Sequence, residues 1–289
     1  MGKIADALEK AGKEQVPIRH ERDIKHERDI KPVCQDRIDS GTDFQAKEEA
    51  VSETKALQGP VDPKLVVFRD PFSPASEHFK MLRSQILYPK DGKRRRLILV
   101  TSAMEGAGKT TVACNLSVSI AQSVDPYVLL IDADIRRSSV CSMLGLEPAE
   151  GLSEYLQRNA NLSKYLIRTP MTKLTVLPAG RSVTNPAELL TSAKMRHLFE
   201  EARERYSDRF IIVDSPPVNL AAETLSLSQN VDAVVFVVRY GFTDKDLIEE
   251  AITKVGEDKI LGIVFNCFES PPGRYSYYKK RYPYYSSKS

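Results

Sequence analysis

The chain has 289 residues, of which 42% are hydrophobic, so it can bury a substantial core in one large or two small domains. A formal net charge of +3 is nearly neutral and gives no reason to expect nucleic acid as a partner. The four scattered cysteines include no C-x-x-C pair and suggest neither a zinc site nor a disulfide framework, and no run of about 18 apolar residues predicts a membrane span. We therefore expect a cytoplasmic protein.

The N-terminal part of the chain is predicted to be an arm. Residues 1–63 are mostly charged and polar with few aromatics, a composition typical of largely disordered segments. Within this arm the hexapeptide HERDIK occurs twice in tandem, at residues 20–25 and 26–31. Two copies are too few for a solenoid, and we interpret them as a local duplication that a tolerant linker accepts.

Between residues 64 and 269, apolar segments alternate with amphipathic ones. The predicted strands are residues 97–100, 128–131, 174–177, 210–213, 234–238 and 260–265, and the predicted helices include residues 110–122, 188–206 and 243–255. This alternation predicts an α/β fold with a mostly parallel sheet and helices on both faces. Residues 270–289 lack this pattern and are predicted to be a tyrosine-rich tail.

The segment 97–111, LILVTSAMEGAGKTT, places a glycine-rich loop between a predicted strand and a predicted helix. The loop glycines let the backbone curve so that several N–H groups point at one anion, which is typical of a phosphate site. Lys109 can reach the terminal phosphates of a nucleotide, and Thr110 can offer its hydroxyl to Mg²⁺. The full pattern, G-x-x-x-x-G-K-[ST], has glycine where this chain has Ala103. The expected nucleotide-binding residues are Glu105, Gly106, Ala107, Gly108, Lys109, Thr110 and Thr111.

Two further predicted strands end in aspartate. Asp132 and Asp134 lie at and just after the end of strand 128–131, and Asp214 follows strand 210–213. Because the carboxyl ends of parallel strands share one edge of a sheet, we expect these side chains near the phosphate-binding loop. Carboxylates brought together repel one another unless a cation joins them, and Mg²⁺ prefers oxygen ligands. The expected Mg²⁺ ligands are Thr110, Asp132 and Asp214.

Four segments of the chain resemble motifs of the bacterial tyrosine kinases of exopolysaccharide and capsule systems, the BY-kinases. TSAMEGAGKTT resembles their Walker A loop, VLLIDADIRRSSV their Walker A′ motif, FIIVDSPPV their Walker B motif and AGRSVTNPAELL the linker before the following helix. The resemblance extends from about residue 72 to the C-terminus. It implies a P-loop NTPase fold, ATP and Mg²⁺ as cofactors, and protein-tyrosine kinase activity.

The same resemblance gives roles to a helix and to the tail. Residues 76–86 are similar to the family's E-x-x-R-x-x-R subunit-contact helix, with a lysine in place of the first arginine, so the expected oligomer contacts are Glu77, Lys80 and Arg83. The tail looks like the family's autophosphorylation site, and the expected acceptors are Tyr275, Tyr277, Tyr278, Tyr282, Tyr284 and Tyr285. We expect the reaction to occur in trans within a homo-oligomeric ring.

Phosphoryl transfer requires mainly positioning and charge stabilisation from a protein. We expect Lys109 to neutralise charge on the β- and γ-phosphates, Asp132 to accept the proton of the tyrosine hydroxyl and Asp134 to assist, so these three are the expected catalytic residues. By analogy with related ATPases, we expect Asn266, at the end of the last predicted strand, to contact the adenine.

In the BY-kinases a membrane protein commonly supplies an activating cytoplasmic segment. Because no membrane span is predicted here, we expect a separate membrane activator or chain-length protein that recruits this chain to the inner face of the membrane. The expected substrates are protein tyrosines, and the expected role is regulation of exopolysaccharide synthesis or export.

Two other functions remain open from the sequence. A partition ATPase of the Min/Par type would use the same fold as an ATP-dependent dimerisation switch, but such proteins usually carry a lysine at the position of Met104 and lack a tyrosine-rich tail. An inactive regulatory homologue would only sense ATP, and the intact set of Lys109, Asp132, Asp134 and Asp214 argues against it.

Overall fold

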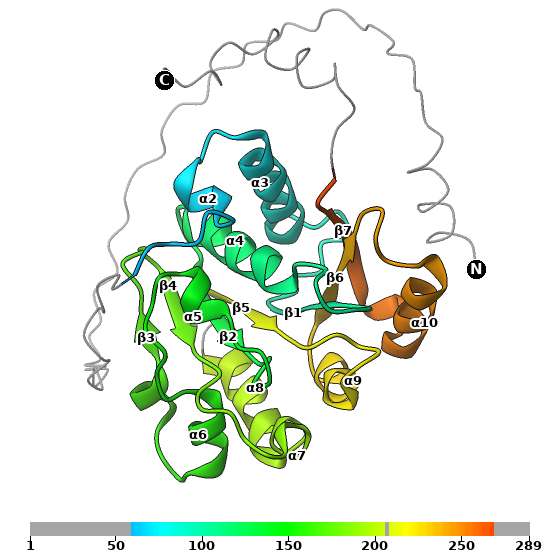
Figure 1. Cartoon of the computed structure of the whole chain (residues 1–289). Helices are drawn as coiled ribbons and strands as arrows, with labels where there is room; N and C mark the ends of the chain where they lie inside the picture. Colours follow the sequence, from blue (N-terminus) through cyan, green and yellow to red (C-terminus); the bar gives the residue numbers. More distant parts are fainter. Residues whose placement is uncertain (1–58, 206–207, 269–289) are drawn as a thin grey trace, which may run out of the picture. The chain divides into compact units, whose positions relative to one another are not determined.

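The computed structural model describes residues 59–205 and 208–268 (Figure 1). All of them belong to one structural unit, Glu48–Ser289, and no residue of the other unit, Met1–Lys47, is described. Most of the predicted arm, including both HERDIK copies, and all of the predicted tail therefore lie outside the described residues, and the domain limits stay predictions. The described chain is already packed at its start, because Val61 is buried and the Gly59 N–H donates to the Gly145 carbonyl at 3.2 Å.

The described residues form a seven-stranded sheet in the order β3-β4-β2-β5-β1-β6-β7. Its strands are β1 (Leu97–Ser102), β2 (Tyr127–Asp132), β3 (Ile167–Arg168), β4 (Leu174–Leu177), β5 (Arg209–Asp214), β6 (Ala233–Arg239) and β7 (Ile260–Asn266). All neighbours pair in parallel except β3 and β4, which are antiparallel. The predicted, mostly parallel α/β sheet is thus confirmed, and the short edge strand β3 was not predicted.

Helices cover both faces of this sheet. They are α2 (Val66–Arg69), α3 (Pro74–Leu87), α4 (Lys109–Ala121), α5 (Val140–Met143), α6 (Leu152–Gln157), α7 (Pro186–Leu190), α8 (Ala193–Arg205), α9 (Ala222–Gln229) and α10 (Lys245–Val255), with 3₁₀ turns η1 (Leu162–Tyr165) and η2 (Glu257–Lys259). In Figure 1, α2, α3 and α4 lie on one side of the sheet and α7, α8 and α9 on the other. The predicted helices 110–122 and 243–255 correspond to α4 and α10.

The predicted helix 188–206 is wrong as a single element, because the chain breaks between α7 and α8. The Thr191 hydroxyl donates back to the Ala187 carbonyl at 2.8 Å, at the end of α7. The Ser192 hydroxyl accepts from the Met195 N–H at 3.2 Å and so caps the start of α8. Hydroxyl side chains at these two positions offer the backbone an alternative to a continuous helix.

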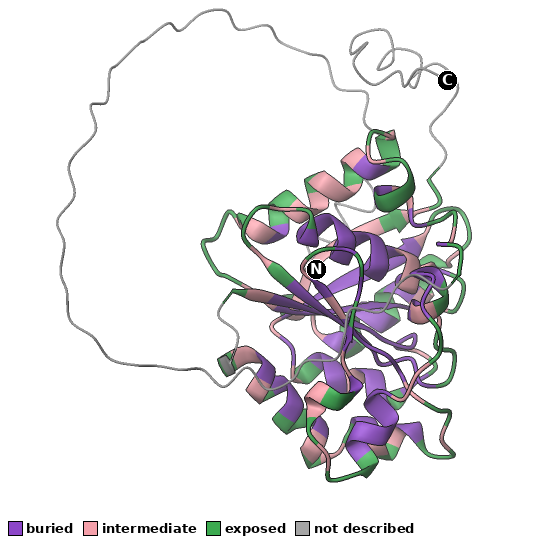
Figure 2. Ribbon diagram, turned by 90° about the vertical axis from the view of Figure 1, so that its left-hand side faces the viewer, coloured by how far each residue is buried: buried purple, intermediate pink, exposed green. Residues whose placement is uncertain are grey.

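The apolar core lies on the central strands, with every residue of β1 buried (Figure 2). Strands covered on both faces have no solvent-facing side, which explains why their sequences are continuous apolar runs. The helix α4 is buried on nearly all sides because the sheet lies under it and α2 and α3 pack over it. Its buried Asn115 accepts from the Val67 N–H at 3.0 Å and donates to the Lys64 carbonyl at 2.9 Å, and these bonds fasten α2 to α4.

The strand register brings the predicted acidic residues together. Asp132 at the end of β2 pairs in register with Asp214 at the end of β5, and Val100 of β1 pairs with Asp214 on the other side. The loop after β1 leads directly into the first residue of α4, Lys109. None of the helices in the described part of the chain is long and apolar enough to cross a lipid bilayer.

Candidate active site

The loop between β1 and α4, the predicted phosphate cradle, contains two glycines with positive φ. Gly106 has φ of +73° and Gly108 has φ of +89°, a region that residues with a side chain rarely adopt. A Cβ atom on Gly108 would lie 2.0 Å from the Asn266 Nδ2 atom, so any larger residue here would also have to displace the Asn266 side chain. Ala103 has no positive φ, which explains why alanine replaces the glycine of the full pattern without strain.

Asn266 anchors this loop from the end of β7. Its Nδ2 atom donates to the Ala107 carbonyl at 2.9 Å, and Ala107 is buried. This contact was not predicted, because nothing in the sequence near Asn266 points to a partner 159 residues away. The expected adenine contact of Asn266 stays a prediction, and any such contact would come from a side chain already fixed to the loop.

The first residues of α4 face the end of β5. Lys109 is 8% exposed, and the Thr110 hydroxyl donates to Asp214 Oδ2 at 2.6 Å. Thr111 lies one position further along α4, and its carbonyl accepts from the Asn115 side chain at 2.8 Å. The structure thus brings together Thr110 and Asp214, which the sequence assigned jointly to Mg²⁺.

Three buried carboxylates lie at this edge of the sheet. Asp132 is 1% exposed, Asp134 is 7% exposed and Asp214 is 1% exposed. Asp132 accepts from two backbone N–H groups, of Asp134 at 3.2 Å and of Val140 at 3.3 Å. The Asp214 Oδ1 atom is buried and has no hydrogen-bond partner among the described residues.

Burial also changes the acidity of these groups. It raises the pKa of Asp214 to about 7, an effect that the hydrogen bond from Thr110 and the charge of Lys109 partly offset. Burial, together with the nearby charge of Asp214, raises the pKa of Asp132 well above its usual range. The pKa of Asp134 is also raised by burial, with Lys109 opposing the shift most strongly. Ionising all three carboxylates is costly unless a cation joins them.

The donor set fits a magnesium ion. The unpartnered Asp214 oxygen lies beside a threonine hydroxyl and opposite Asp132, which is an all-oxygen environment. Among the described residues, no group of three or more His, Cys, Asp and Glu side chains could hold a metal ion by itself. Mg²⁺ needs no such protein cage, because it is usually bound by one or two carboxylates together with phosphate oxygens and waters.

Two arginines after β2 connect the loop that carries Asp134 to its neighbours. The Arg136 guanidinium lies 3.1 Å from Glu223 Oε1, and Glu223 is a buried residue in the first turn of α9. Arg137 forms an ion pair with Glu105 of the phosphate-binding loop. The sequence shows the two arginines but not these partners, because each pair joins segments far apart in the chain.

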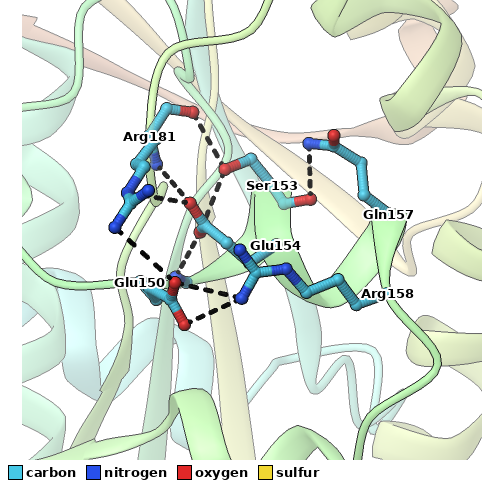
Figure 3. Close-up of polar contacts among 7 residues, drawn as sticks. Glu150, Ser153, Glu154, Gln157, Arg158 and Arg181 are labelled. Atoms are coloured by element: carbon cyan, nitrogen blue, oxygen red, sulfur yellow. Dashed lines mark hydrogen bonds and ion pairs between the residues drawn. The ribbon is translucent and has the colours of Figure 1, made fainter.

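The loop after β4 is held by a separate polar cluster. The cluster consists of Glu150, Ser153, Glu154, Gln157, Arg158 and Arg181 (Figure 3). Glu154 is buried and accepts from the Gly151 N–H at 2.7 Å and the Arg181 N–H at 3.1 Å. Burial alone would raise the pKa of Glu154, but these N–H groups bring it below its usual value. The Arg181 side chain is 77% exposed, with its Nη2 atom 3.8 Å from Glu150.

The predicted oligomer-contact residues make contacts within this chain. Lys80 Nζ donates to Glu77 Oε1 at 2.6 Å and to the Pro71 carbonyl at 2.8 Å. Arg83 Nη1 donates to the Ser119 carbonyl at 2.8 Å, in the last turn of α4. Their role between subunits stays a prediction, and the predicted acceptor tyrosines lie outside the described residues.

Comparisons with known proteins identify the family of the chain. Residues 95–255 match the family model described as an AAA domain. The tyrosine-protein kinase YwqD of Bacillus subtilis is 32% identical over 217 residues, which cover 74% of this chain and 90% of that protein.

Solved structures of other proteins also resemble this chain. The chimerical protein CapA2B2 superimposes with a TM-score of 0.67 at 32% identity, covering 74% of this chain and 96% of that one. The kinase domain of the Escherichia coli tyrosine kinase ETK superimposes with a TM-score of 0.66 at 27% identity, covering 73% and 83%. The septum site-determining protein MinD of Pyrococcus horikoshii, with a TM-score of 0.51 at 20% identity and coverage of 61% and 74%, shares the fold alone. These relatives show that the chain belongs to the bacterial tyrosine-protein kinases, as the sequence motifs indicated.

Proposed function

We propose that this kinase transfers the γ-phosphate of Mg·ATP to tyrosine side chains, including those of its own C-terminal tail. The observation that carries the proposal is the Thr110–Asp214 hydrogen bond beside the unpartnered Asp214 oxygen, at the N-terminus of α4. A helix N-terminus and a glycine-rich loop that precedes it favour the phosphates, and the oxygen donors favour the metal ion.

The residues of the site have different proposed roles in phosphoryl transfer. Lys109 neutralises the charge that develops on the β- and γ-phosphates, together with the N–H groups of residues 105–108. Thr110, Asp214 and Asp132 are the proposed ligands of Mg²⁺, which when bound supplies charge neutralisation and orients the phosphates. Asp132 is also the proposed acceptor of the tyrosine proton, because its carboxylate lies at the end of β2 in register with Asp214, at the edge of the sheet where the phosphates are proposed to bind. Asp134 assists from the same loop.

The partners of the chain belong to the same proposal. We infer a homo-oligomeric ring in which one subunit phosphorylates the tail of the next, and a separate membrane activator that recruits the chain from the cytoplasm to the inner face of the membrane. The proposed role is regulation of exopolysaccharide synthesis or export. Support comes from the family of the chain and from the six tyrosines gathered in residues 275–285.

The proposal is tested by incubating the full chain with Mg·ATP and mapping phosphotyrosine by mass spectrometry. We expect label on the tail tyrosines of the wild-type protein and none on Lys109→Met, since that variant loses the phosphate-neutralising cation. Label that persists in Lys109→Met would indicate a contaminating kinase. ATP hydrolysis with no phosphotyrosine, even at concentrations that favour self-association, would contradict the proposal and favour the Min/Par type of switch.

A further inference from the structure

The phosphate-binding loop contains a carboxylate, which is an unfavourable neighbour for a nucleotide. Glu105 directly precedes Gly106, and its side chain is 45% exposed at the rim of the cradle. A triphosphate carries several negative charges, so an uncompensated carboxylate at this rim repels it. A positive charge beside Glu105 would offset this repulsion.

Arg137 supplies that charge from the loop after β2. Its guanidinium forms an ion pair with the Glu105 carboxylate across 32 residues of sequence. Its backbone N–H donates to the Asp134 side chain at 3.2 Å and to the Asp134 carbonyl at 3.1 Å. These two bonds hold the backbone of Arg137 in the turn that also carries Asp134, so the guanidinium starts from a fixed place next to the cradle.

The Glu105–Arg137 ion pair is exposed to solvent and contributes little to the stability of the fold. The Arg137 side chain is 70% exposed, and exposed ion pairs contribute little to the free energy of unfolding. The neighbouring Arg136 is used differently, because its partner Glu223 is buried. The Glu105–Arg137 pair therefore differs from the Arg136–Glu223 pair in two ways. Neither of its side chains is buried, and one of them belongs to the phosphate-binding loop.

We propose that Arg137 raises the affinity for the nucleotide by neutralising Glu105, the carboxylate of the phosphate-binding loop. The inference rests on the proposed function, since it takes the nucleotide to bind in this loop. Arg137 acts through Glu105 and is a positioning residue for charge, not a catalytic one.

The experiment measures the dissociation constant of Mg·ADP by calorimetry for four forms of the full chain. Arg137→Gln removes the ion-pair partner of the Glu105 carboxylate, and we expect Mg·ADP to bind more weakly by roughly five- to tenfold at low salt. Glu105→Gln leaves the arginine charge uncompensated, and we expect tighter binding. The double variant removes both charges of the pair and so keeps the net charge of wild type, and we expect an affinity within about twofold of wild type. All differences are expected to shrink at high salt, because these charges are exposed to solvent.

Arg181→Gln is the matched control. It removes one exposed arginine from the loop after β4, where the neighbours of the guanidinium are Glu150 and Glu154 and not the phosphate loop (Figure 3). We expect its affinity for Mg·ADP to equal that of wild type. Thermal unfolding of each variant verifies that the fold is intact.

Two results would overturn the inference while leaving the proposed function standing. If Arg137→Gln binds Mg·ADP as well as wild type, the pair does not set affinity. If the double variant is as weak as Arg137→Gln alone, the arginine contacts the nucleotide directly and does not act through Glu105. A wild-type chain that binds no Mg·ADP would instead overturn the proposed function and this inference together.

Discussion

Asp214 shows how one residue can connect stability with ligand binding. Its carboxylate is buried, has one unpartnered oxygen, and has its pKa raised by that burial to about 7. The folded apo protein therefore holds a proton on this group more tightly than the unfolded chain, where the pKa is near 3.8. A cation in the site would remove the cost of ionising it.

The free energy of unfolding should therefore fall as pH rises when no cation is bound. In the presence of a chelator, the contribution of Asp214 to the free energy of unfolding should decrease by a few kcal/mol as pH rises from about 4 to about 7. The raised pKa values of Asp132 and Asp134 should add decreases of the same sign. Asp214→Asn cannot ionise at this position, so we expect a smaller decrease than in wild type and a greater stability than wild type at pH 8. Chemical denaturation across pH measures both. Asp125→Asn, the same change at an exposed position, is the control, and a decrease in Asp214→Asn as large as that in wild type would contradict the prediction.

Gly108 gives a second prediction at the scale of one residue. Gly108→Ala combines a φ of +89° with a Cβ only 2.0 Å from Asn266 Nδ2. We expect a loss of stability on the order of 2–3 kcal/mol and at least tenfold weaker binding of Mg·ADP, because Asn266 must leave the loop that it anchors.

Gly92→Ala separates the effect of a positive φ from the effect of the contact with Asn266. Gly92 has φ of +68° but nothing within 4 Å of an added Cβ, so we expect it to lose about 1 kcal/mol and to bind Mg·ADP normally. Equal binding by Gly108→Ala and Gly92→Ala would show that the contact with Asn266 is unimportant.

At the scale of elements, Arg83 fastens α3 to the end of α4. The Ser119 carbonyl lies in the last turn of α4, where carbonyl groups lack partners within the helix, and the guanidinium satisfies it. We expect Arg83→Ala to lower the free energy of unfolding by about 1–2 kcal/mol, and Lys80→Ala by about 0.5 kcal/mol or less. If the loss from Arg83→Ala appears only at high protein concentration, the residue acts between subunits and not within one.

The elements that the sequence predicted well are those with a local signature. The strands of the sheet centre appear as apolar runs, and the strand–loop–helix order around Lys109 follows from one motif. The helix α9 escaped prediction because it buries polar side chains, Glu223, Thr224 and Ser228, and so shows no apolar period. The contacts of Asn266, Arg136 and Arg137 escaped for another reason, since each depends on a partner that only the folded sheet brings close.

At the scale of the whole molecule, the tail can change its charge more than any other part of the chain. Residues 270–289 contain five basic residues, no acidic residue and six tyrosines. Each phosphate adds about −1.5 to −2 charges, so complete phosphorylation would take the segment from +5 to roughly −5. A tail that is attracted to acidic surfaces of a neighbouring subunit would then be repelled by them, as well as by the triphosphate site.

We therefore expect phosphorylation of the tail to lower the affinity between subunits. Sedimentation velocity should show larger species for the unphosphorylated chain than for the chain after incubation with Mg·ATP. A variant with all six tail tyrosines changed to Phe keeps the basic charge and cannot accept phosphate, so its sedimentation should not respond to Mg·ATP. Since nucleotide alone could also change assembly, Mg·ADP with the wild-type chain serves as the second control. An oligomer whose size is the same before and after phosphorylation would mean that the charge of the tail does not govern assembly, and that the tyrosines serve another step of the cycle.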